Sequence, residues 1–359
     1  MEYVEISKVI DIELGKTPSR NNTDYWNGKN TWITIADMTQ KYIEESKEKI
    51  TDIAIKNTKI KKVPQNTVIM SFKLSIGKRA ITKAEVYTNE AIAAFHIKDL
   101  KSLIPEYLYY ALESVDFLRY TDKAVKGKTL NKEKLKKIRI PIFSLSVQLK
   151  ISEILNKIQK IIENKRKQIF LLEELVKSRF IEMFGDPIRN EKGWKVKKWE
   201  EVLKIINGKN QKKVENQSGK YDIFGSGGKM GKADDWLVKE NSVLIGRKGS
   251  INKPIIVKEK IWNVDTVFGL EPNIEIINCD YLYYFCYFYD FERLNKAVTI
   301  PSLTKKDLLK IDIPIPPLVL QEKFVLIHKS INKLKFEAEK SLKEMENLYE
   351  SLMQKFFKQ

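Results

Sequence analysis

Hydrophobic residues along the chain follow two periods, and each period predicts a different kind of element. Short apolar runs bounded by turn residues predict β-strands at 31–37, 66–72, 78–83 and 91–97, and again at 243–250, 253–258 and 266–272. A segment rich in Tyr and Phe follows each set of strands, near 105–120 and near 279–295, and predicts a helix. The pattern therefore indicates an α+β fold with two mixed α/β globules.

Two longer segments, 144–184 and 317–359, carry apolar residues at helical spacing, which predicts long helices with coiled-coil seams. The first seam, interrupted at Lys165, consists of Ile151, Leu155, Ile158, Ile162, Ile169, Leu172 and Val176. The second consists of Phe324, Ile331, Leu334, Ala338, Leu342, Met345, Leu348 and Leu352. Gly185-Asp186-Pro187 predicts the end of the first helix.

A helix of about 40 residues is about 60 Å long, which exceeds the need of one small domain. We therefore expect the two helices to pair antiparallel and to hold the globules apart. The alternative, in which each helix only covers the globule before it, stays open. The expected domains are a first globule at 1–143, a first helix at 144–187, a second globule at 188–316 and a second helix at 317–359.

The second half of the chain repeats the first. TLNKEKLKKIRIPIFSLSVQ at 129–148 returns as SLTKKDLLKIDIPIPPLVLQ at 302–321, an offset of 173 (302 − 129). YLYY at 107–110 likewise returns at 281–284. Further matched pairs are Phe117 with Phe291, Arg119 with Arg293, Asn89 with Asn263 and Phe95 with Phe268. Ordered matches at a nearly constant offset indicate a duplication, and hence a pseudo-two-fold repeat with two similar sites.

The charge balance favours an acidic partner. The net charge is +18, from 65 Lys and Arg residues against 47 Asp and Glu residues, and such an excess favours salt-dependent binding to nucleic acid. The opposing interpretation is that lysine, asparagine and isoleucine reflect an AT-biased genome. No apolar run is long enough to span a membrane, and the first residues carry carboxylates where a secretory signal would be apolar. We therefore expect a cytoplasmic protein without a membrane partner.

The two cysteines, Cys279 and Cys286, lie in the second aromatic segment. Seven residues along a helix span about 10 Å, which is too far for a disulfide. We therefore expect buried thiols in a reducing compartment. His96 and His328 do not complete a zinc-site spacing, so no metal is expected.

A basic turn after a strand occurs in both halves. Aligning 68–78 with 243–253 pairs Lys73 with Lys248, Ser75 with Ser250 and Lys78 with Lys253. Arg79 and Arg247 add a guanidinium to each turn. Lys and Arg neutralise phosphates, Arg can also read guanine, and Ser can donate to either. We predict that these residues contact DNA, although a single basic turn is usually only a solvated surface.

A second candidate is the Gly/Pro turn at 15–20, which offers Lys16, Thr17, Ser19 and Arg20 and precedes Tyr25-Trp26. Its counterpart, Asn207-Gly208-Lys209, begins alike and then diverges. Divergence within a duplicated frame is expected of two surfaces that read different sequences, and equally of neutral loop drift. Lys229, in the glycine-rich string 224–232, is a further basic candidate; that string does not match either phosphate-binding glycine motif.

Catalytic motifs are otherwise missing from the sequence. It contains no H-E-x-x-H, no G-x-S-x-G, and no Asn/Asp-Pro-Pro-aromatic string of the kind found in amino-methyltransferases. We therefore expect a non-catalytic protein without its own cofactor. Two rival hypotheses are an enzyme with an unrecognised motif and a coiled-coil scaffold that binds only proteins.

The chain resembles the specificity (S) subunits of type I restriction-modification systems, over essentially its whole length. The resemblance rests on GKTPSR with the following YW.G and W.TIAD (15–37), FGSGGKMG with VLIGRKGS and KP (224–254), WNVDTVF (262–268), and the twin L..I.IP segments before the long helices. The departure is that the second globule lacks the TPSR continuation after Lys209.

This resemblance implies two target-recognition domains, each reading half of a split, asymmetric site in double-stranded DNA. It also implies two spacer helices on which two modification (methyltransferase) subunits dock, with restriction subunits outside them where the system has them. Those partners, and not this chain, would bind S-adenosylmethionine and methylate adenine.

Overall fold

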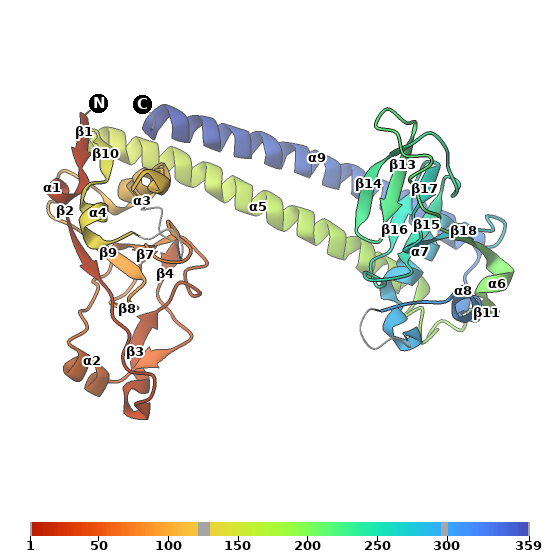
Figure 1. Cartoon of the computed structure of the whole chain (residues 1–359), viewed down its shortest axis with the longest axis horizontal. Coiled ribbons are helices and arrows are strands. Elements are labelled where there is room, and N and C mark those ends of the chain that lie inside the picture. The colour runs from red at the N-terminus through yellow and green to blue at the C-terminus, as the bar shows by residue number, and fades with distance from the viewer. Residues whose placement is uncertain (1, 121–129, 296–300, 358–359) are drawn as a thin grey trace. The chain divides into compact units, whose positions relative to one another are not determined.

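The computed structural model describes residues 2–120, 130–295 and 301–357 (Figure 1), so part of the first predicted globule, 121–129, lies outside the described residues, as do 296–300. The chain forms two compact units. Unit 1 comprises Met1–Asn164 with Leu342–Gln359, and unit 2 comprises Lys165–Ser341. Each long helix thus contributes to both units. The division into recognition domains and spacers stays a prediction.

Unit 1 begins with a strand that pairs with the last strand of its globule, and one long helix follows. Its elements are β1 (Glu2–Glu5), α1 (Ile6–Val9), β2 (Ile10–Leu14), η1 (Thr23–Tyr25), β3 (Trp26–Ile33), β4 (Tyr42–Ile43), β5 (Lys49–Ile50), α2 (Asp52–Thr58), β6 (Val68–Ser71), β7 (Arg79–Thr82), β8 (Tyr87–Thr88), β9 (Ile92–Ile97), α3 (Pro105–Glu113), η2 (Phe117–Tyr120), α4 (Lys132–Lys136), β10 (Arg139–Ile142) and α5 (Leu145–Phe184).

Unit 2 has a similar element order. Its elements are β11 (Lys195–Lys198), α6 (Trp199–Val202), β12 (Leu203–Asn207), β13 (Tyr221–Gly225), β14 (Gly228–Ala233), β15 (Ser242–Gly246), β16 (Ile255–Val257), β17 (Ile261–Asn263), β18 (Val267–Pro272), α7 (Cys279–Phe288), η3 (Phe291–Leu294), α8 (Lys305–Leu308), β19 (Asp312–Ile315) and α9 (Leu318–Phe357).

The sheets of the two units have matching topology. The largest sheet has the order β2-β9-β6-β7-β4 in unit 1 and β12-β18-β15-β16 in unit 2. A second sheet, β5-β3-β8 or β14-β13-β17, contains one parallel pair in each unit. The third is the antiparallel pair β1-β10 or β11-β19. The predicted α+β class and internal repeat are therefore confirmed.

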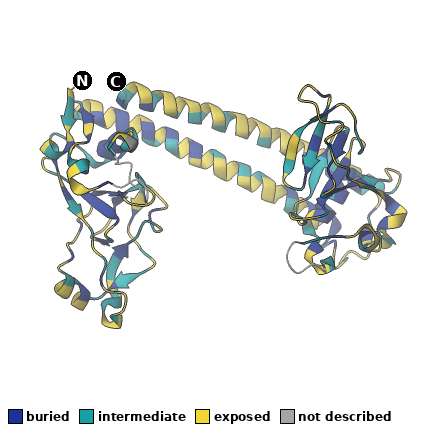
Figure 2. Ribbon diagram, viewed as in Figure 1, coloured by how far each residue is buried: buried dark blue, intermediate teal, exposed yellow. Residues whose placement is uncertain are grey.

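The largest sheet of unit 1 is covered on both faces, which explains why all four residues of β6 are buried. Val68 and Met70 face the core that contains α3 and α5, while Ile69 faces a second core with Ile33 and Met38. Figure 2 shows the buried strands within each unit and the exposed outer sides of the long helices. A sheet packed on two sides is a rigid base for the turns at its ends.

Two predicted strands end earlier than expected. The run 31–37 is a strand only to Ile33, because Asp37 Oδ2 accepts hydrogen bonds from the Thr34 backbone N–H (2.8 Å) and Thr34 Oγ1 (2.6 Å), which closes a turn. The run 243–250 stops being a strand after Gly246. The aromatic helices are also shorter than predicted and end at Glu113 and Phe288, each followed by a 3-10 turn.

A buried glutamine fixes the start of each long helix. Gln148, fully buried, donates from Nε2 to the carbonyls of Ser102 (2.7 Å) and Phe143 (2.8 Å), and its Oε1 accepts from the Ile104 N–H (3.1 Å). These bonds tie α5 to the start of α3. Gln321 makes the same three bonds in unit 2, with the carbonyls of Ile276 and Pro316 and the N–H of Asn278. Buried backbone groups outside regular elements need such partners.

The end of each long helix completes the core of the unit that it reaches. In unit 1, Met353 and Phe357 of α9 join the cluster around Tyr107, whose ring centroid lies 5.4 Å from that of Phe357. In unit 2, Phe180 and Phe184 of α5 pack among aromatic rings of α7 and α9. The alternative in which each helix only covers the globule before it is therefore wrong.

The helix halves within each unit run antiparallel. Gln159 of α5 donates to Tyr349 of α9 (3.0 Å) in unit 1, where Ile151 shares a core with Phe357. In unit 2, Glu173 accepts from Lys335, and Phe180 packs on Phe324.

The predicted α9 seam is wrong at two positions. Leu334 is 58% exposed and Leu348 is 42% exposed. His328, Lys335 and Tyr349 instead make polar contacts to other elements of their own unit, so the apolar spacing alone did not locate the contact face. Gly185, with φ +76°, follows α5 as predicted.

Replacement of Phe357 by alanine should destabilise unit 1. The side chain is 3% exposed in an aromatic core, and truncations of this kind cost about 3–5 kcal/mol. Denaturant unfolding of wild type and Phe357→Ala measures the difference. Phe336→Ala is the matched control, since Phe336 is on the same helix and 64% exposed, and it should change stability by less than about 0.5 kcal/mol. Equal effects of the two variants would contradict the assignment of Phe357 to the core.

Candidate nucleic-acid interface

The topology of unit 1 brings its two predicted contact segments to one end of the largest sheet. Ser71, the last residue of β6, pairs with Ile92, and Leu14, the last residue of β2, pairs with Ala93. The turn at 73–78 and the loop at 15–20 therefore leave the sheet at the same end. The segment 73–78 is called the first basic turn below.

Unit 2 repeats this arrangement. Gly246, at the end of β15, pairs with Val267, and Asn207, at the end of β12, pairs with Phe268. The segment 247–253, called the second basic turn below, therefore lies at the sheet end that also carries Gly208 and Lys209. The β13–β14 hairpin comes close as well, because a Cβ on Gly249 would lie 3.7 Å from Ser226 Oγ.

The Gly-Lys turns at 15–16 and 208–209 are built alike. A Cβ on Gly15 would lie 2.2 Å from the Asn89 carbonyl oxygen, and one on Gly208 would lie 1.8 Å from that of Val264, so only glycine fits. Each lysine carbonyl accepts from an indole N–H at 3.0 Å, that of Trp32 for Lys16 and that of Trp262 for Lys209. The repeat in the sequence does not indicate this shared role of the two indoles, because they lie on non-equivalent strands, β3 and β17.

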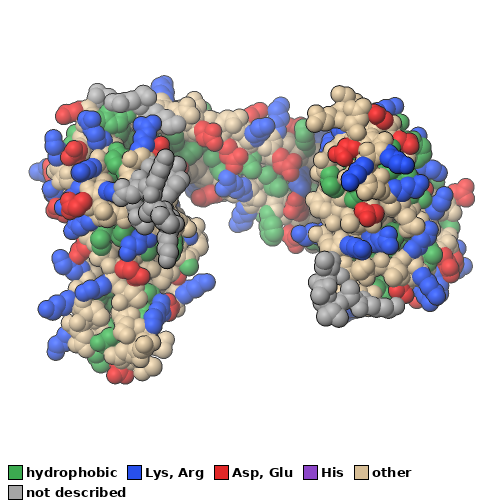
Figure 3. All heavy atoms as spheres, viewed as in Figure 1, with side chains coloured by type: hydrophobic (Ala, Val, Ile, Leu, Met, Phe, Trp, Pro, Cys, Tyr) green, Lys and Arg blue, Asp and Glu red, His purple; other side chains and the backbone are tan. Residues whose placement is uncertain are grey.

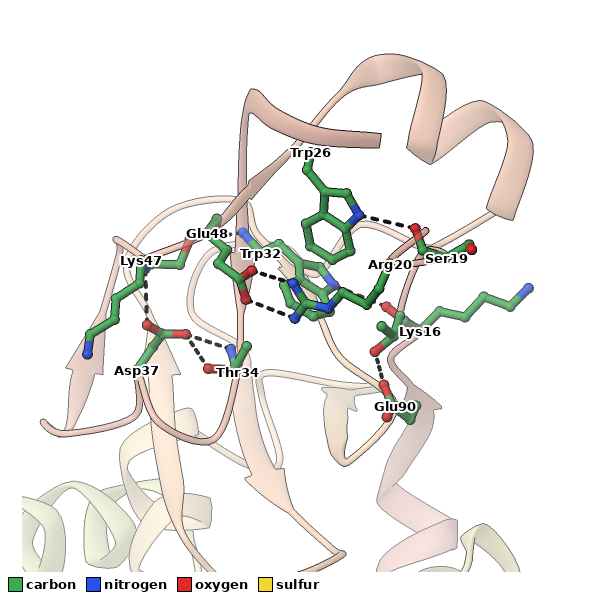
Figure 4. Close-up of polar contacts among 12 residues, drawn as sticks. Lys16, Ser19, Arg20, Trp26, Trp32, Thr34, Asp37, Lys47, Glu48 and Glu90 are labelled. Atoms are coloured by element: carbon green, nitrogen blue, oxygen red, sulfur yellow. Dashed lines mark hydrogen bonds and ion pairs between the residues drawn. The ribbon is translucent and has the colours of Figure 1, made fainter. Parts of the chain in front are cut away.

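In the loop at 15–20, the predicted contact residues are engaged within the protein (Figure 4). The Arg20 guanidinium lies 4.0 Å from the Trp26 ring centroid and 5.1 Å from that of Trp32, and it forms a two-bond ion pair with Glu48. Lys16 Nζ donates to the Thr58 carbonyl (2.7 Å), and Thr17 donates to Glu90. Ser19 is exposed, and its carbonyl accepts from Trp26 (3.1 Å). Contacts within the protein therefore hold the polar groups of this loop.

Several other predicted residues also have internal partners. Arg79 pairs with Glu113 (3.1 Å) and has a side chain that is only 13% exposed. Lys78 Nζ donates to the Ile35 carbonyl (2.7 Å). Lys229 pairs with Asp222 (2.8 Å). These three cations support the local structure, and their charges are already partly compensated.

The remaining predicted residues lie on the two basic turns and face solvent more freely. Lys73, Ser75, Lys248 and Lys253 are exposed, and Arg247 and Ser250 are partly exposed. The Lys73 ammonium lies 5.4 Å from the centroid of the Phe72 ring, and the Arg247 guanidinium lies 5.6 Å from that of the Phe268 ring. The two turns therefore present cations at equivalent sites of the two units.

Overall charge does not locate the interface by itself. Figure 3 shows Lys and Arg side chains spread over the visible face of each unit, with Asp and Glu among them. A hollow of about 340 Å³ in unit 2 lies at the other end of the sheet, near Leu203 and Pro272, and is lined by Glu200, Glu201 and Glu271 as well as by lysines. Such a lining does not suit a polyanion, so the turns remain the better candidates.

The cysteines and the histidine network of unit 2 are buried, and the histidine is bonded within the protein. Cys279 and Cys286 are free and buried, and burial raises the pKa of Cys279 to about 12, which leaves an inert thiol. His328 is 7% exposed; its Nδ1 contacts Asp280 (2.7 Å) and its Nε2 contacts Asn332 (2.8 Å), so both ring nitrogens have partners.

The Asp280 carboxyl is held ionised. Burial acts to raise its pKa, but hydrogen bonds from His328 and Lys258 outweigh burial and leave the pKa below its ordinary value. No residue spacing in the sequence indicated the pair of Asp280 and His328, which joins α7 to α9 across 48 residues. Among the described residues, no group of three or more His, Cys, Asp or Glu side chains could hold a metal ion, and no helix is both long and apolar enough to cross a membrane.

Comparison with known proteins defines the class. The family model of the type I restriction modification DNA specificity domain matches residues 1–173 and again 191–347. The chain belongs to this family, and the resemblance predicted from its motifs is confirmed.

Similar proteins of known name are also specificity subunits of type I restriction enzymes. The chain is 31% identical over 227 residues to the MjaIX specificity subunit of Methanocaldococcus jannaschii, covering 57% of this chain and 52% of that protein. It is 23% identical over 277 residues to the EcoprrI specificity subunit of Escherichia coli, covering 70% and 67%. The chain thus spans about half the length of the first relative. A solved type I S subunit from M. genitalium shares the fold, with 17% identity, a TM-score of 0.65, and coverage of 99% and 96%.

The Arg20–Glu48 pair should titrate in acid. The hydrogen bond from Arg20 holds the pKa of Glu48 below its ordinary 4.5, so the pair stabilises the fold above that value and is lost as the pH falls through the lowered pKa. Indole emission from Trp26 and Trp32 should therefore stay constant from pH 7 to 5 and change below 4.5. Fluorescence of wild type and Glu48→Gln tests this, with far-UV circular dichroism as the control for unfolding. The same acid transition in Glu48→Gln would rule the pair out as its source.

Proposed function

We propose that this chain is the non-catalytic DNA-recognition subunit of a type I restriction-modification complex, and that each unit reads one part of a bipartite site. The observation that carries the proposal is the recurrence of one exposed basic turn at the same sheet end of both units. Cations at such a turn suit phosphates, and Arg247 and the serines suit base edges. Family membership supports the same function.

The site is proposed to be asymmetric, because the two turns occupy equivalent places but differ in side chains. The first basic turn reads Lys73-Leu74-Ser75, and the second reads Lys248-Gly249-Ser250 after Arg247. The β13–β14 hairpin belongs to the sheet β14-β13-β17 of unit 2, whereas unit 1 has the sheet β5-β3-β8 in its place. If both half-sites face one side of the duplex, their centres lie about 10 bp apart.

The long helices are proposed to dock two modification subunits. On α5, Leu149 and Ile154 in unit 1 and Phe170 and Leu171 in unit 2 are 42–58% exposed. Contiguous exposed apolar side chains mark contact surfaces, and the adjacent Phe170 and Leu171 support such a surface on α5. One solved structure with the same fold, 17% identical and with a TM-score of 0.63, was described for the complex assembly of a type I restriction-modification system.

In this proposal the partner methyltransferase binds S-adenosylmethionine and methylates adenine, while this chain holds no cofactor. Restriction subunits join outside the modification subunits where the system has them. The complex works in the cytoplasm, where it meets the host DNA.

The decisive experiment is to co-express the chain with the methyltransferase subunit from the same genome and to map N6-methyladenine across the host DNA. A split, asymmetric methylated motif that disappears without this chain is the expected result. Co-purification of the two proteins without any motif would instead favour the scaffold hypothesis. Methylation or cleavage by the purified chain alone, with S-adenosylmethionine and magnesium, would contradict the non-catalytic role.

The two substitutions in the second basic turn should differ in effect: loss of the base contact changes the half-site read by unit 2 only, and loss of the phosphate contact weakens binding in general. Arg247→Ala should lower the preference for the correct bases in the half-site read by unit 2 by about tenfold or more. Lys248→Ala should weaken binding to all sequences and reduce the slope of log affinity against log salt concentration by about 1. Lys204→Ala is the control, since Lys204 is exposed at the other end of the sheet. The measurements are motif mapping and duplex affinity at several salt concentrations. An equal loss of base preference in both half-sites after Arg247→Ala would contradict the proposal that each unit reads its own half-site.

A further inference from the structure

Leu74, at the tip of the first basic turn, has a backbone conformation that leucine rarely adopts. Its φ is +61°, in the left-handed region that favours glycine. The other non-glycine residues with positive φ in the described part of the chain are asparagines, which tolerate this region, and Lys59 at the end of α2. Leu74 is therefore an exception that local sequence preference does not explain.

The duplicated turn shows what the backbone alone requires. Gly249 occupies the equivalent position, three residues after the end of its strand, and has φ +79°. The same backbone hydrogen bond follows in both turns, from the Ile76 N–H to the Leu74 carbonyl (3.1 Å) and from the Ile251 N–H to the Gly249 carbonyl (2.9 Å). The turn thus needs a left-handed residue, and unit 2 uses glycine there.

Packing of the Leu74 side chain does not offset this backbone strain. It is 89% exposed, the largest fraction among the exposed large apolar side chains of the described residues. A single exposed leucine is ordinary on a protein surface. Exposure together with an unfavourable backbone is not, and such strain persists where the surrounding structure imposes it, typically at functional sites.

The first basic turn is rigid enough to hold the leucine outward. Ser71, fully buried, accepts from the Lys78 N–H on its Oγ (3.1 Å) and donates from the same oxygen to the Ser75 carbonyl. The Gly77 N–H donates to the Ser71 carbonyl (2.9 Å). Lys73 and Ser75 flank the leucine and are exposed. An apolar tip thus stands between a cation and a hydroxyl.

We propose that Leu74 is an apolar base contact of unit 1, which reads the C5-methyl group of a thymine while Lys73 binds the adjacent phosphate. The thymine methyl is the apolar group that base pairs present in the major groove, and apolar side chains recognise it. The inference rests on the proposed function and adds to it a residue that sets specificity. It also accounts for the asymmetry between the turns, since Gly249 offers no side chain at the same place.

The test compares duplex affinity of wild type, Leu74→Ala and Leu74→Gly, using the methylated motif once it is mapped and a random duplex of equal length. Both variants should bind the motif about tenfold more weakly and the random duplex equally well, with an unchanged salt slope, because phosphate contacts are kept. Leu74→Gly should retain or raise the melting temperature, since glycine relieves the strain. Leu100→Ala is the matched control: Leu100 is 63% exposed and follows β9 at the opposite end of the sheet.

Replacing thymine by uracil, one position at a time, identifies the partner. At one position of the half-site read by unit 1, loss of the methyl should weaken wild type and leave Leu74→Ala unaffected. Wild-type affinity retained in Leu74→Ala would overturn this inference alone. So would a loss on random duplex equal to that on the motif, the absence of any thymine coupled to Leu74, or lost co-purification with the methyltransferase while DNA binding persists. A wild-type chain without sequence preference would overturn the proposed function itself.

Discussion

Burial of the aromatic ends of the two long helices is the constraint on which the rest of the structure depends. Phe357 completes the core of unit 1, and Phe184 completes that of unit 2. Neither globule closes its core with its own strands and aromatic helix, because α3 and α7 each leave an apolar side that a long-helix end covers. The helices are therefore part of both compact units and not only connectors, and the buried glutamines fix where each helix begins.

This packing determines what can vary at the sheet ends. The largest sheet of unit 1 is covered on both faces, so its strands and their spacing are constrained by two cores. The turns after β6 and β15 each place one isoleucine against a core, Ile76 and Ile251. Their exposed residues contact neither core and can change at small cost in stability. A sheet packed on both faces, with exposed turns at one end, suits a surface that binds another molecule.

The sequence predicted the fold class, the duplication, the long helices and the basic turns, because these depend on periodicity and repetition. It did not predict which cations are already paired. Arg79 meets Glu113 and Lys78 meets the Ile35 carbonyl through tertiary contacts across 34 and 43 residues (113 − 79; 78 − 35). Spacing also misplaced Leu334 and Leu348, since the seam of α9 includes polar and aromatic residues such as Tyr349 that an apolar template omits. Phe184 and Phe357 do match at the repeat offset of 173 (357 − 184), so the sequence held that signal.

Comparison of the two basic turns helps to explain the backbone strain at Leu74. A left-handed backbone at a non-glycine residue costs of order 1–3 kcal/mol, a noticeable part of the stability of a domain. In a single copy, Leu74 could be taken as a surface residue of no consequence. Gly249 shows that the same turn forms without that cost, so the leucine is there for a reason other than folding. Because its side chain contacts solvent and not the protein, that reason lies outside the chain, at the sheet end where the unit presents its exposed cations.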